Sequence, residues 1–369
     1  MTESGSTLKA AIVHDWFAVP GGSEDCALEF SRMLPEAAVY TSFFNAGLYG
    51  EVLDPRRVHP WPMQRFSGGT DSFRAFLPLY PVWFGALRLR GYDLVISSSS
   101  AFAKSVRTDA RTLHAAYIHT PMRFAWDLDG YLSGSSMGRV PRIGARLMRD
   151  VLRGWDRRTA ARPDILVANS TVVQRRIEAL WGRPARIIFP PVRVEEFTVS
   201  PQDDGFFLTA ARMLSYRRLD LVVEACSRLG RPLVLVGKGP EEKSLRRIAG
   251  SSVIFKPRIS RSELIDLMSR CSGYIVPGTE DFGIAPVEAM AAGKPVIAYR
   301  AGGAVDTVVE GVTGLFFDEP SSESLADAID RFDKVPFDRL AIRRHAEEFA
   351  PDVFRQRWRD LLAENGIKV

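Results

Sequence analysis

The stretch from Cys271 to Asp318 constrains the fold most, because it alternates short apolar runs with glycine-containing turns and a helix-like segment. Gly273 to Val276 is apolar and ends at a proline–glycine turn, as a buried strand does. Residues 286–292 begin with proline and are followed by glycine, which is typical of a helix, and residues 295–299 form a second apolar run. This order predicts a parallel α/β sheet, whose ligands bind beyond the carboxyl ends of its strands.

Two acidic residues bracket the turn in this stretch. Glu280 lies on the predicted turn and Glu288 in the predicted helix, so both can face one crevice. Ionised carboxylates only accept hydrogen bonds, which suits the hydroxyls of a sugar or a ribose. Backbone N–H groups of Phe282, Gly283 and Ile284 lie near the start of the helix, where they can hold phosphate oxygens. The alternative is that both glutamates are solvated surface groups, as most glutamates are.

The pattern Glu280-x7-Glu288 closely resembles the donor-site signature of the retaining glycosyltransferases of family 4. The other residues that carry the resemblance are Phe282-Gly283, Pro286, Ala289, Gly293, Pro295-Val296 and Gly302-Gly303. The resemblance covers almost the full chain and is strongest over residues 206–318. It implies the α/β GT-B fold, in which two Rossmann-like domains with parallel sheets face each other across a cleft.

The length of 369 residues is natural for two domains. The polar segment from Glu195 to Gly205 has the composition of a connection between domains. We therefore predict an N-terminal Rossmann-like acceptor domain over residues 1–194. A C-terminal Rossmann-like donor domain, which binds the nucleotide sugar, is predicted over residues 195–348. The resemblance implies that residues 349–369 contain a last helix that packs back on the N-terminal domain.

A glycine pair follows the first predicted strand. Gly21 and Gly22 come after the apolar run Lys9 to Val13 and precede Ser23, which we predict to cap a helix. A glycine pair lets the backbone approach a ligand closely, although it also serves in simple turns. By resemblance, this loop lies between the donor diphosphate and the acceptor.

His119 directly follows the predicted strand Ala115 to Ile118, so it should face the crevice rather than the core. A histidine in such a place is either a structural group or a functional one. The triplet His119-Thr120-Pro121, with Arg123 and Trp126 nearby, matches this group of glycosyltransferases. By resemblance, His119 contacts the donor sugar.

Arg212 and Arg217 follow the predicted strand Phe206 to Ala210. Two guanidinium groups at a strand end can clamp a diphosphate and stabilise the charge that grows on a leaving group. The family usually has lysine where Arg217 stands. The charge is therefore kept at this position, while the geometry of the contact differs.

Among members of the family, the chain most resembles bacterial mannosyltransferases that build lipopolysaccharide or exopolysaccharide. The resemblance implies transfer of a sugar, which we expect to be mannose from GDP-mannose, to a hydroxyl of a glycan or a lipid-linked acceptor. The anomeric configuration is retained. A nucleotide-sugar epimerase of the same fold and a non-catalytic nucleotide-sugar-binding partner are the alternatives.

The sequence also bears on the mechanism. No third acid beside a crevice strand stands out as a nucleophile, which favours front-side attack without a covalent intermediate. Glu280, His119, Arg212 and Arg217 are then the catalytic candidates, and they act by positioning and charge. No Asp-x-Asp pair follows a predicted strand, so we expect neither a metal nor a cofactor besides the nucleotide-sugar substrate.

The formal net charge of +5 favours anionic partners, and none of the motifs indicates nucleic acid. Two segments are candidates for contact with an anionic membrane: the aromatic residues 73–90 and the arginine-rich residues 139–162. Core packing and a solvated face are the alternatives. No run is long and apolar enough for a signal peptide or a membrane span. We therefore expect a cytoplasmic protein, with peripheral contact to the inner face of the cell membrane left open.

Overall fold

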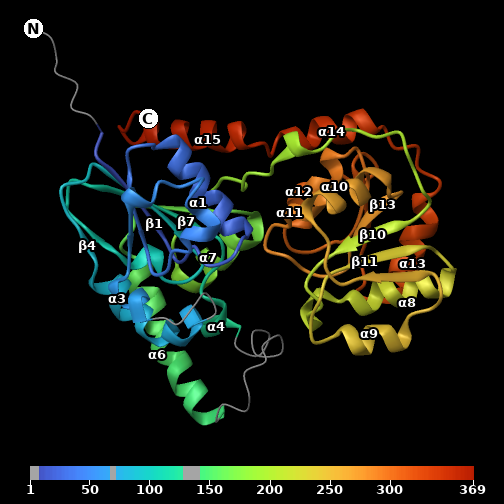
Figure 1. The fold of residues 1–369 in the computed structure, drawn as a ribbon, viewed down its shortest axis with the longest axis horizontal. Helices are drawn as coiled ribbons and strands as arrows, with labels where there is room; N and C mark the ends of the chain where they lie inside the picture. The colour runs from blue at the N-terminus through green and yellow to red at the C-terminus, as the bar shows by residue number, and fades with distance from the viewer. Residues whose placement is uncertain (1–7, 67–71, 128–141) are drawn as a thin grey trace, which may run out of the picture. The chain divides into compact units, whose positions relative to one another are not determined.

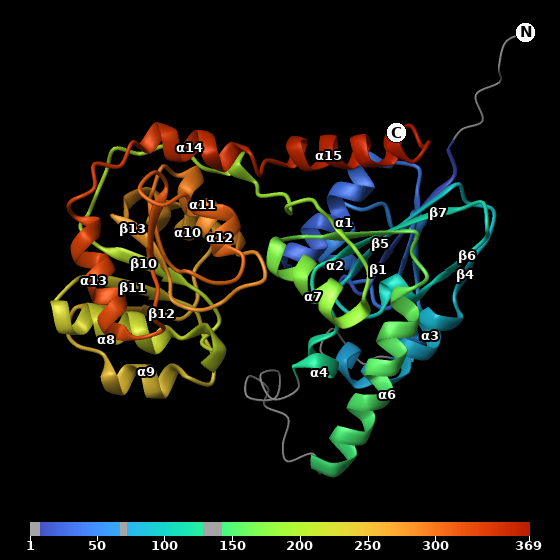
Figure 2. The ribbon, with the colours of Figure 1, turned by 180° about the vertical axis from the view of Figure 1, so that it is seen from behind.

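The computed structural model describes residues 8–66, 72–127 and 142–369. It divides into two compact units (Figures 1 and 2). The first unit contains the described residues up to 191 together with residues 354–369, and the second unit contains residues 192–353. The sequence analysis expected boundaries after residues 194 and 348.

The first unit is built on a seven-stranded sheet in which all neighbouring strands are parallel. The order across the sheet is β3-β2-β1-β5-β7-β8-β9. The strands are β1 (Ala10–His14), β2 (Ala38–Thr41), β3 (Val58–Pro60), β5 (Leu94–Ser99), β7 (Leu113–Ile118), β8 (Ile165–Ala168) and β9 (Arg186–Ile187). Strands β1 and β5 are buried along their whole length, which is typical of a sheet covered by helices on both faces.

Alternate residues of β1 belong to the two apolar layers of this unit. Ile12 packs with helices α1 and α15, whereas Val13 packs with helix α3 on the other face. The helices are α1 (Gly22–Met33), α2 (Ala46–Tyr49), α3 (Tyr80–Ala86), α4 (Arg123–Trp126), α6 (Arg142–Ala160), α7 (Thr171–Trp181) and α15 (Pro351–Glu364). Two short strands, β4 (Arg88–Leu89) and β6 (Arg107–Thr108), form a separate small sheet.

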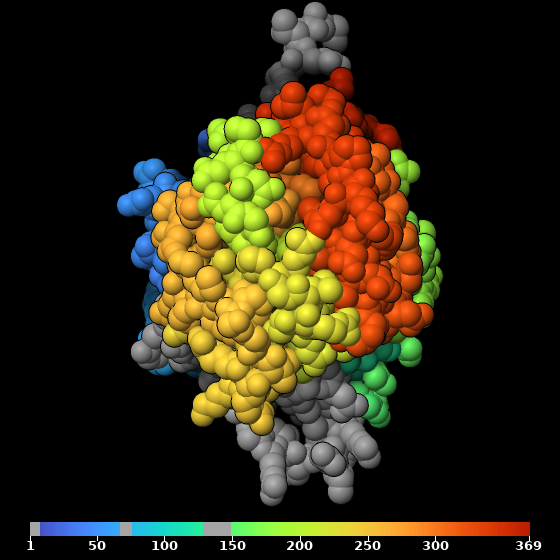
Figure 3. Space-filling view, turned by 90° about the vertical axis from the view of Figure 1, so that its right-hand side faces the viewer, coloured from blue at the N-terminus to red at the C-terminus, as the bar shows by residue number. Residues whose placement is uncertain are grey.

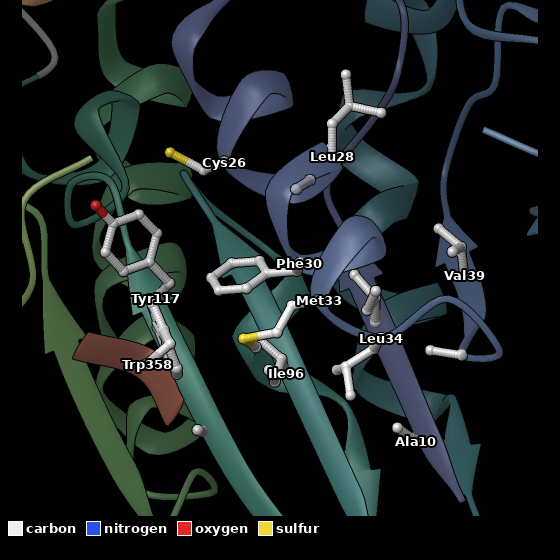
Figure 4. Packing of buried hydrophobic residues seen from close by; sticks show 14 of the residues in the cluster. Ala10, Cys26, Leu28, Phe30, Met33, Leu34, Val39, Ile96, Tyr117 and Trp358 are labelled. Atoms are coloured by element: carbon white, nitrogen blue, oxygen red, sulfur yellow. The ribbon is translucent and has the colours of Figure 1, made fainter. Parts of the chain in front are cut away.

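Helix α15, from the end of the chain, is part of the first unit's core. Trp358 is fully buried, and its ring centroid lies 4.8 Å from that of Phe30 and 5.9 Å from that of Tyr117 (Figure 4). Arg355 forms an ion pair with Glu29, a buried acid of α1. Burying one large apolar side chain stabilises a fold by about 1.5–3 kcal/mol. The last helix therefore contributes directly to the stability of the first unit.

The second unit contains a six-stranded parallel sheet in the order β12-β11-β10-β13-β14-β15. The strands are β10 (Phe207–Ala210), β11 (Leu233–Val236), β12 (Val253–Lys256), β13 (Gly273–Val276), β14 (Val296–Tyr299) and β15 (Gly314–Phe317). The helices are α8 (Leu219–Leu229), α9 (Glu242–Ile248), α10 (Arg261–Arg270), α11 (Ile284–Ala291), α12 (Ala304–Thr307), α13 (Ser322–Phe332) and α14 (Arg339–Glu347). Helices α8 and α13, yellow and red-orange in Figure 3, pack against one another. The predicted pair of parallel α/β units is confirmed.

Two local predictions differ from the structure. Ser23 was expected to cap α1, but the cap is Gly21 in an extended conformation, and the Ser23 hydroxyl donates to Glu24. Helix α11 begins at Ile284, two residues before the proline that was expected to start it. Proline is tolerated in the first turn of a helix because the backbone N–H groups of that turn have no acceptor within the helix.

A buried ion pair joins several elements of the first unit. Lys104 and Asp156 are 1% and 0% exposed, and Lys104 Nζ lies 2.6 Å from Asp156 Oδ1. The second carboxylate oxygen of Asp156 accepts hydrogen bonds from the indole nitrogens of Trp126 and Trp181, at 2.7 and 2.8 Å. Lys104 also donates to the carbonyl of Ala101. This pair connects the loop after β5 with α4, α6 and α7.

Replacing Asp156 by alanine should lower the free energy of unfolding of the first unit by about 3–5 kcal/mol, because the Lys104 charge is left buried without its counter-ion. Chemical denaturation followed by tryptophan fluorescence measures this loss. The matched control is Glu364→Ala, which removes an exposed pair with Arg186 in the same unit. The control should change the free energy by less than about 0.5 kcal/mol, and equal effects of the two substitutions would contradict the prediction.

Candidate active site

In the first unit, three polar side chains meet at the carboxyl ends of β1, β5 and β7. His14 ends β1 and lies in register with Ser98 near the end of β5. His14 Nδ1 lies 3.2 Å from the Ser98 carbonyl oxygen and 3.1 Å from Ser98 Oγ. Ser98 Oγ in turn lies 2.8 Å from Nε2 of His119, which directly follows β7. His119, the histidine predicted from the sequence, is therefore held by Ser98, which His14 contacts in turn; neither Ser98 nor His14 was predicted.

His14 is buried, and this burial determines its charge. Burial lowers the pKa of His14 to about 4, although hydrogen bonds with the backbone of Ser98 and Trp16 act in the opposite direction. The imidazole is therefore neutral near pH 7. His119 itself is only partly buried, and its carbonyl oxygen accepts a hydrogen bond of 3.1 Å from the side chain of Asn169.

Asp15, the residue after β1, anchors the loop after β5. Its two carboxylate oxygens accept hydrogen bonds from four successive backbone N–H groups, those of residues 100–103, at 2.6–2.9 Å. Burial raises the pKa of Asp15 above its usual value, and the four hydrogen bonds oppose that rise. Asp15 follows a strand end in the sequence, which is a signal for a site residue, but its four partners lie about 85 positions away and leave no local pattern.

The predicted glycine pair lies at the same edge of the sheet, at the start of α1. A side-chain carbon on Gly21 would lie 2.7 Å from Glu24 Oε2, the end of a flexible side chain that would have to shift. Glu24 is 4% exposed, and burial raises its pKa to about 7, against the effect of its hydrogen bond with Ser23. The sequence analysis missed Glu24, although an acid soon after a glycine pair is a visible signal.

In the second unit, the structure brings Arg217 and Glu280 together as an ion pair. Arg217 ends a short 3-10 helix, Ser215–Arg217, which follows β10, and Glu280 lies on the loop after β13. Burial acts to lower the pKa of Arg217, but Glu280 and Tyr216 together outweigh burial and raise that pKa above its usual value. Arg212, the other predicted cation, follows β10 and is exposed to solvent.

Glu288 lies in α11 and is 8% exposed. Its Oε1 atom lies 2.7 Å from Nη2 of Arg261, the first residue of α10. The same guanidinium group contacts Glu196 Oε2 at 2.7 Å and lies over the ring of Phe197. Arg261 was not predicted, because nothing in the sequence shows that a residue 27 positions before Glu288 contacts it.

The predicted backbone donors lie at the start of α11. Gly283 is the cap residue with φ +89°, and Ile284 is the first helical residue. Gly303 packs directly on this loop: a side-chain carbon there would lie 2.3 Å from Phe282 Cα, and its N–H donates to the Glu280 carbonyl at 2.9 Å. The glycine pair after β14 thus supports the loop that carries the predicted site residues.

Known proteins resemble this chain along most of its length. The family model described as Glycosyltransferase Family 4 matches residues 20–196, and the model described as Glycosyl transferases group 1 matches residues 194–349. The chain is 29% identical over 358 residues to a D-inositol 3-phosphate glycosyltransferase of Acidothermus cellulolyticus. This match covers 84% of this chain and 78% of that protein. It is 26% identical over 171 residues to an uncharacterised glycosyltransferase of Methanocaldococcus jannaschii, and this match spans about half of each protein, 45% and 48%.

Among solved structures, HepE of Anabaena in complex with UDP-glucose is similar to this chain with a TM-score of 0.69 at 19% identity. The similarity covers 96% of this chain and 99% of HepE, so the two share a fold. Because the two family models together account for residues 20–349, the chain belongs to glycosyltransferase family 4, and it has the GT-B fold.

Proposed function

We propose that this glycosyltransferase is a hexosyltransferase that moves a sugar from a nucleotide sugar to a hydroxyl of a glycan or a lipid-linked acceptor, with retention of configuration. The observation that carries the proposal is the arrangement after β13, where Glu280 pairs with Arg217 and Glu288 pairs with Arg261 within one unit. Together they supply two carboxylates for hydroxyl groups and cations for phosphate. Family membership supports the same chemistry.

In this proposal the donor is held by groups of opposite charge. Arg212 and Arg217 bind the diphosphate, and the N–H groups of residues 282–284 assist at the start of α11. Glu288 accepts hydrogen bonds from the ribose, and Glu280 accepts them from the sugar. A bound diphosphate would replace Glu280 as the partner of Arg217, while sugar hydroxyls would take up the released carboxylate. Every charge then keeps a partner, which limits the cost of the exchange.

The proposed reaction is a front-side substitution. The acceptor oxygen forms a bond to the anomeric carbon as the bond to the diphosphate oxygen breaks. The departing diphosphate takes the proton of the acceptor hydroxyl. The protein contributes position and charge: Arg212 and Arg217 stabilise the negative charge that grows on the diphosphate, while Glu280 and His119 orient the sugar.

Thermal melting of the protein with a panel of GDP-, UDP- and ADP-sugars tests the proposal directly. The resemblance favours GDP-mannose, whereas HepE is described with UDP-glucose, so the base and the sugar are the two open variables. A ligand at 100 times its Kd stabilises the folded state by about 2.7 kcal/mol, which raises the melting temperature. Because of the resemblance to mannosyltransferases, we expect the largest rise with GDP-mannose. A larger shift with UDP-glucose would contradict the mannose assignment. No shift with any GDP-, UDP- or ADP-sugar would contradict donor binding.

Replacing Glu288 by alanine should raise the Kd of the donor by about 10–150-fold, which corresponds to about 1.5–3 kcal/mol for a hydrogen bond to a charged group. Arg261 keeps Glu196 as a partner in this variant, so the loss reports on the ligand contact. Calorimetry measures the affinity. The matched control is Glu242→Ala on α9, which removes an exposed ion pair with Arg246. Unchanged affinity in a folded Glu288→Ala variant would remove Glu288 from the site.

Contact with a membrane is also part of the proposal. In the described residues, no helix is both long and apolar enough to cross a bilayer. Figures 1 and 2 both place α3 beside α6 in the first unit. Tyr80 and Phe84 of α3 are buried in the core, but Val82 of α3 and Val151 of α6 are 71% and 65% exposed. Exposed apolar residues on a basic surface suit an anionic lipid headgroup region.

Changing Arg142, Arg146 and Arg149 of α6 to serine should weaken sedimentation with anionic vesicles by about 100-fold, at about 1 kcal/mol for each basic residue. Arg153 is left unchanged, because it donates to the Ala125 carbonyl at 2.7 Å and supports the fold.

The matched control removes three arginines from the second unit, Arg228, Arg246 and Arg247. It should keep vesicle binding, and both variants should keep donor affinity. If the wild-type protein does not sediment with anionic vesicles at low salt, membrane contact is excluded under these conditions.

A further inference from the structure

The second unit contains a cavity between α8 and α9 that is separate from the proposed donor site. Figures 1 and 2 both show these two helices side by side. The cavity has a volume of about 570 Å³, which is typical of sites for small molecules. Arg212, Arg217, Glu280 and Glu288 do not line it. The cavity therefore has no role yet in the proposed reaction.

Part of the cavity wall is apolar. Leu214, Leu219 and Leu245 line the cavity and are at most 5% exposed. Ile248 of α9 also lines it and is 42% exposed, so it offers apolar surface that a ligand can cover. Such a wall favours a ligand with an aromatic or aliphatic body.

The charged groups of the cavity leave one cation without a partner. Arg218 holds Asp220 through two contacts, from Nε to Oδ1 at 3.2 Å and from Nη2 to Oδ2 at 3.0 Å. Glu241 caps the start of α9, where a negative charge is favoured, and it accepts a hydrogen bond of 2.9 Å from the Ser244 hydroxyl. Arg247 is exposed, and it forms no ion pair or hydrogen bond with the described residues. The cavity therefore favours an anionic group.

Arg218 has a backbone conformation that glycine adopts more readily. Its φ is +50° and its ψ is +40°, and among the described residues it is the only one besides glycines with a positive φ. This conformation is unfavourable for a residue with a side chain. The chain nevertheless has an arginine here, and its side chain lies in the wall of the cavity. Strained residues of this kind cluster at sites that bind ligands.

The cavity and the proposed donor site share one segment, the 3-10 helix Ser215–Arg217. Ser215 lines the cavity, whereas Arg217 pairs with Glu280. Gly278, on the loop after β13, packs directly against this segment, since a side-chain carbon there would lie 2.6 Å from the Arg217 carbonyl oxygen. The 3-10 helix therefore has no room to move toward that loop, while the cavity leaves room on its own side. A ligand in the cavity holds the 3-10 helix, and Arg217 with it, in place.

We propose that this cavity is a second ligand site, which binds a small anion with an aromatic or aliphatic body, and that its occupation raises the affinity for the donor. The apolar body covers the leucines, and the anionic group pairs with Arg247. Because the 3-10 helix is then already ordered, donor binding has less entropy to remove. The ligand site stands without the proposed function, but the effect on the donor rests on the proposed contact between Arg217 and the diphosphate.

The probe for this site is 1-naphthylacetate, which combines an aromatic body with a carboxylate. Calorimetry at pH 7.5 should give a Kd of about 1 mM or tighter, as expected for a ligand of this size. Acetate lacks the aromatic body, and 1-naphthylmethylamine carries the opposite charge. Both should bind at least about tenfold more weakly than the probe.

Two variants place the probe in the cavity. Arg247→Glu should weaken its binding by about tenfold, because an acid replaces the cation. The matched control is Lys334→Glu, which makes the same change of charge at an exposed residue outside the cavity and should keep the affinity. Arg218→Gly should also weaken binding, because Asp220 loses its partner and repels the anion. Its melting temperature should stay equal or rise, since glycine adopts this conformation without strain, so the loss is not one of fold.

The effect on the donor is measured in the same way. With the cavity saturated by 1-naphthylacetate, the Kd of GDP-mannose, or of the sugar nucleotide that the melting panel selects, should fall by about fivefold. The donor should lower the Kd of the probe by the same factor, as linkage requires. Arg247→Glu should abolish this effect and leave donor affinity without the probe unchanged.

Three results would overturn the ligand site: no binding of 1-naphthylacetate, equal affinity for 1-naphthylmethylamine, or equal affinity in the wild-type protein and Arg247→Glu. Bound probe with unchanged donor affinity would overturn the effect on the donor. The proposed function fails in a different way. In that case no GDP-, UDP- or ADP-sugar binds with or without the probe, while the probe itself still binds.

Discussion

The carboxylate of Asp15 determines the geometry of the polar edge in the first unit. It accepts four successive backbone N–H groups from residues 100–103, and so it fixes the end of β1 to the loop after β5. Ser98 lies just before this loop and Lys104 just after it. The contact of Ser98 with His119 and the buried pair of Lys104 with Asp156 both depend on the position of that loop. One buried acid thus supports both the core and the candidate site.

In the second unit, the proposed donor site must bind both phosphate groups and sugar hydroxyls, so it needs cations and carboxylates side by side. Arg217 pairs with Glu280, and Arg261 is shared between Glu288 and Glu196. Glu288 is buried, and Arg217, Glu280 and Glu196 are only partly exposed, so an unpaired charge on any of them would be costly. Pairing keeps these side chains ordered near the place where we propose that the donor binds. A ligand that carries both kinds of group can take over these partners without leaving a charge unpaired.

The sequence predicted the features that depend on local pattern. The alternation of strands and helices, and the turn with Glu280 and Glu288, follow from residues close together in the chain. The contacts that hold the site do not. Asp15 lies 85 positions from the first of its partners, and Arg261 lies 65 positions from Glu196, so only the folded chain brings them together. The cap of α1 was mispredicted for a local reason, because the Glu24 carboxylate accepts the hydrogen bond of the Ser23 hydroxyl.

Two neighbouring serines of β5 show why residue type alone does not identify a functional group. Ser97 and Ser98 point to opposite faces of the sheet, and each contacts Nε2 of a histidine. His114 lies within β7, and burial lowers its pKa to about 3, with the nearby charges of Arg162 and Arg183 acting in the same direction. His119 lies just beyond the end of the same strand and is partly exposed. A contact between a serine and a histidine is therefore part of the core where the histidine lies within the strand. It can serve a ligand only where the strand ends.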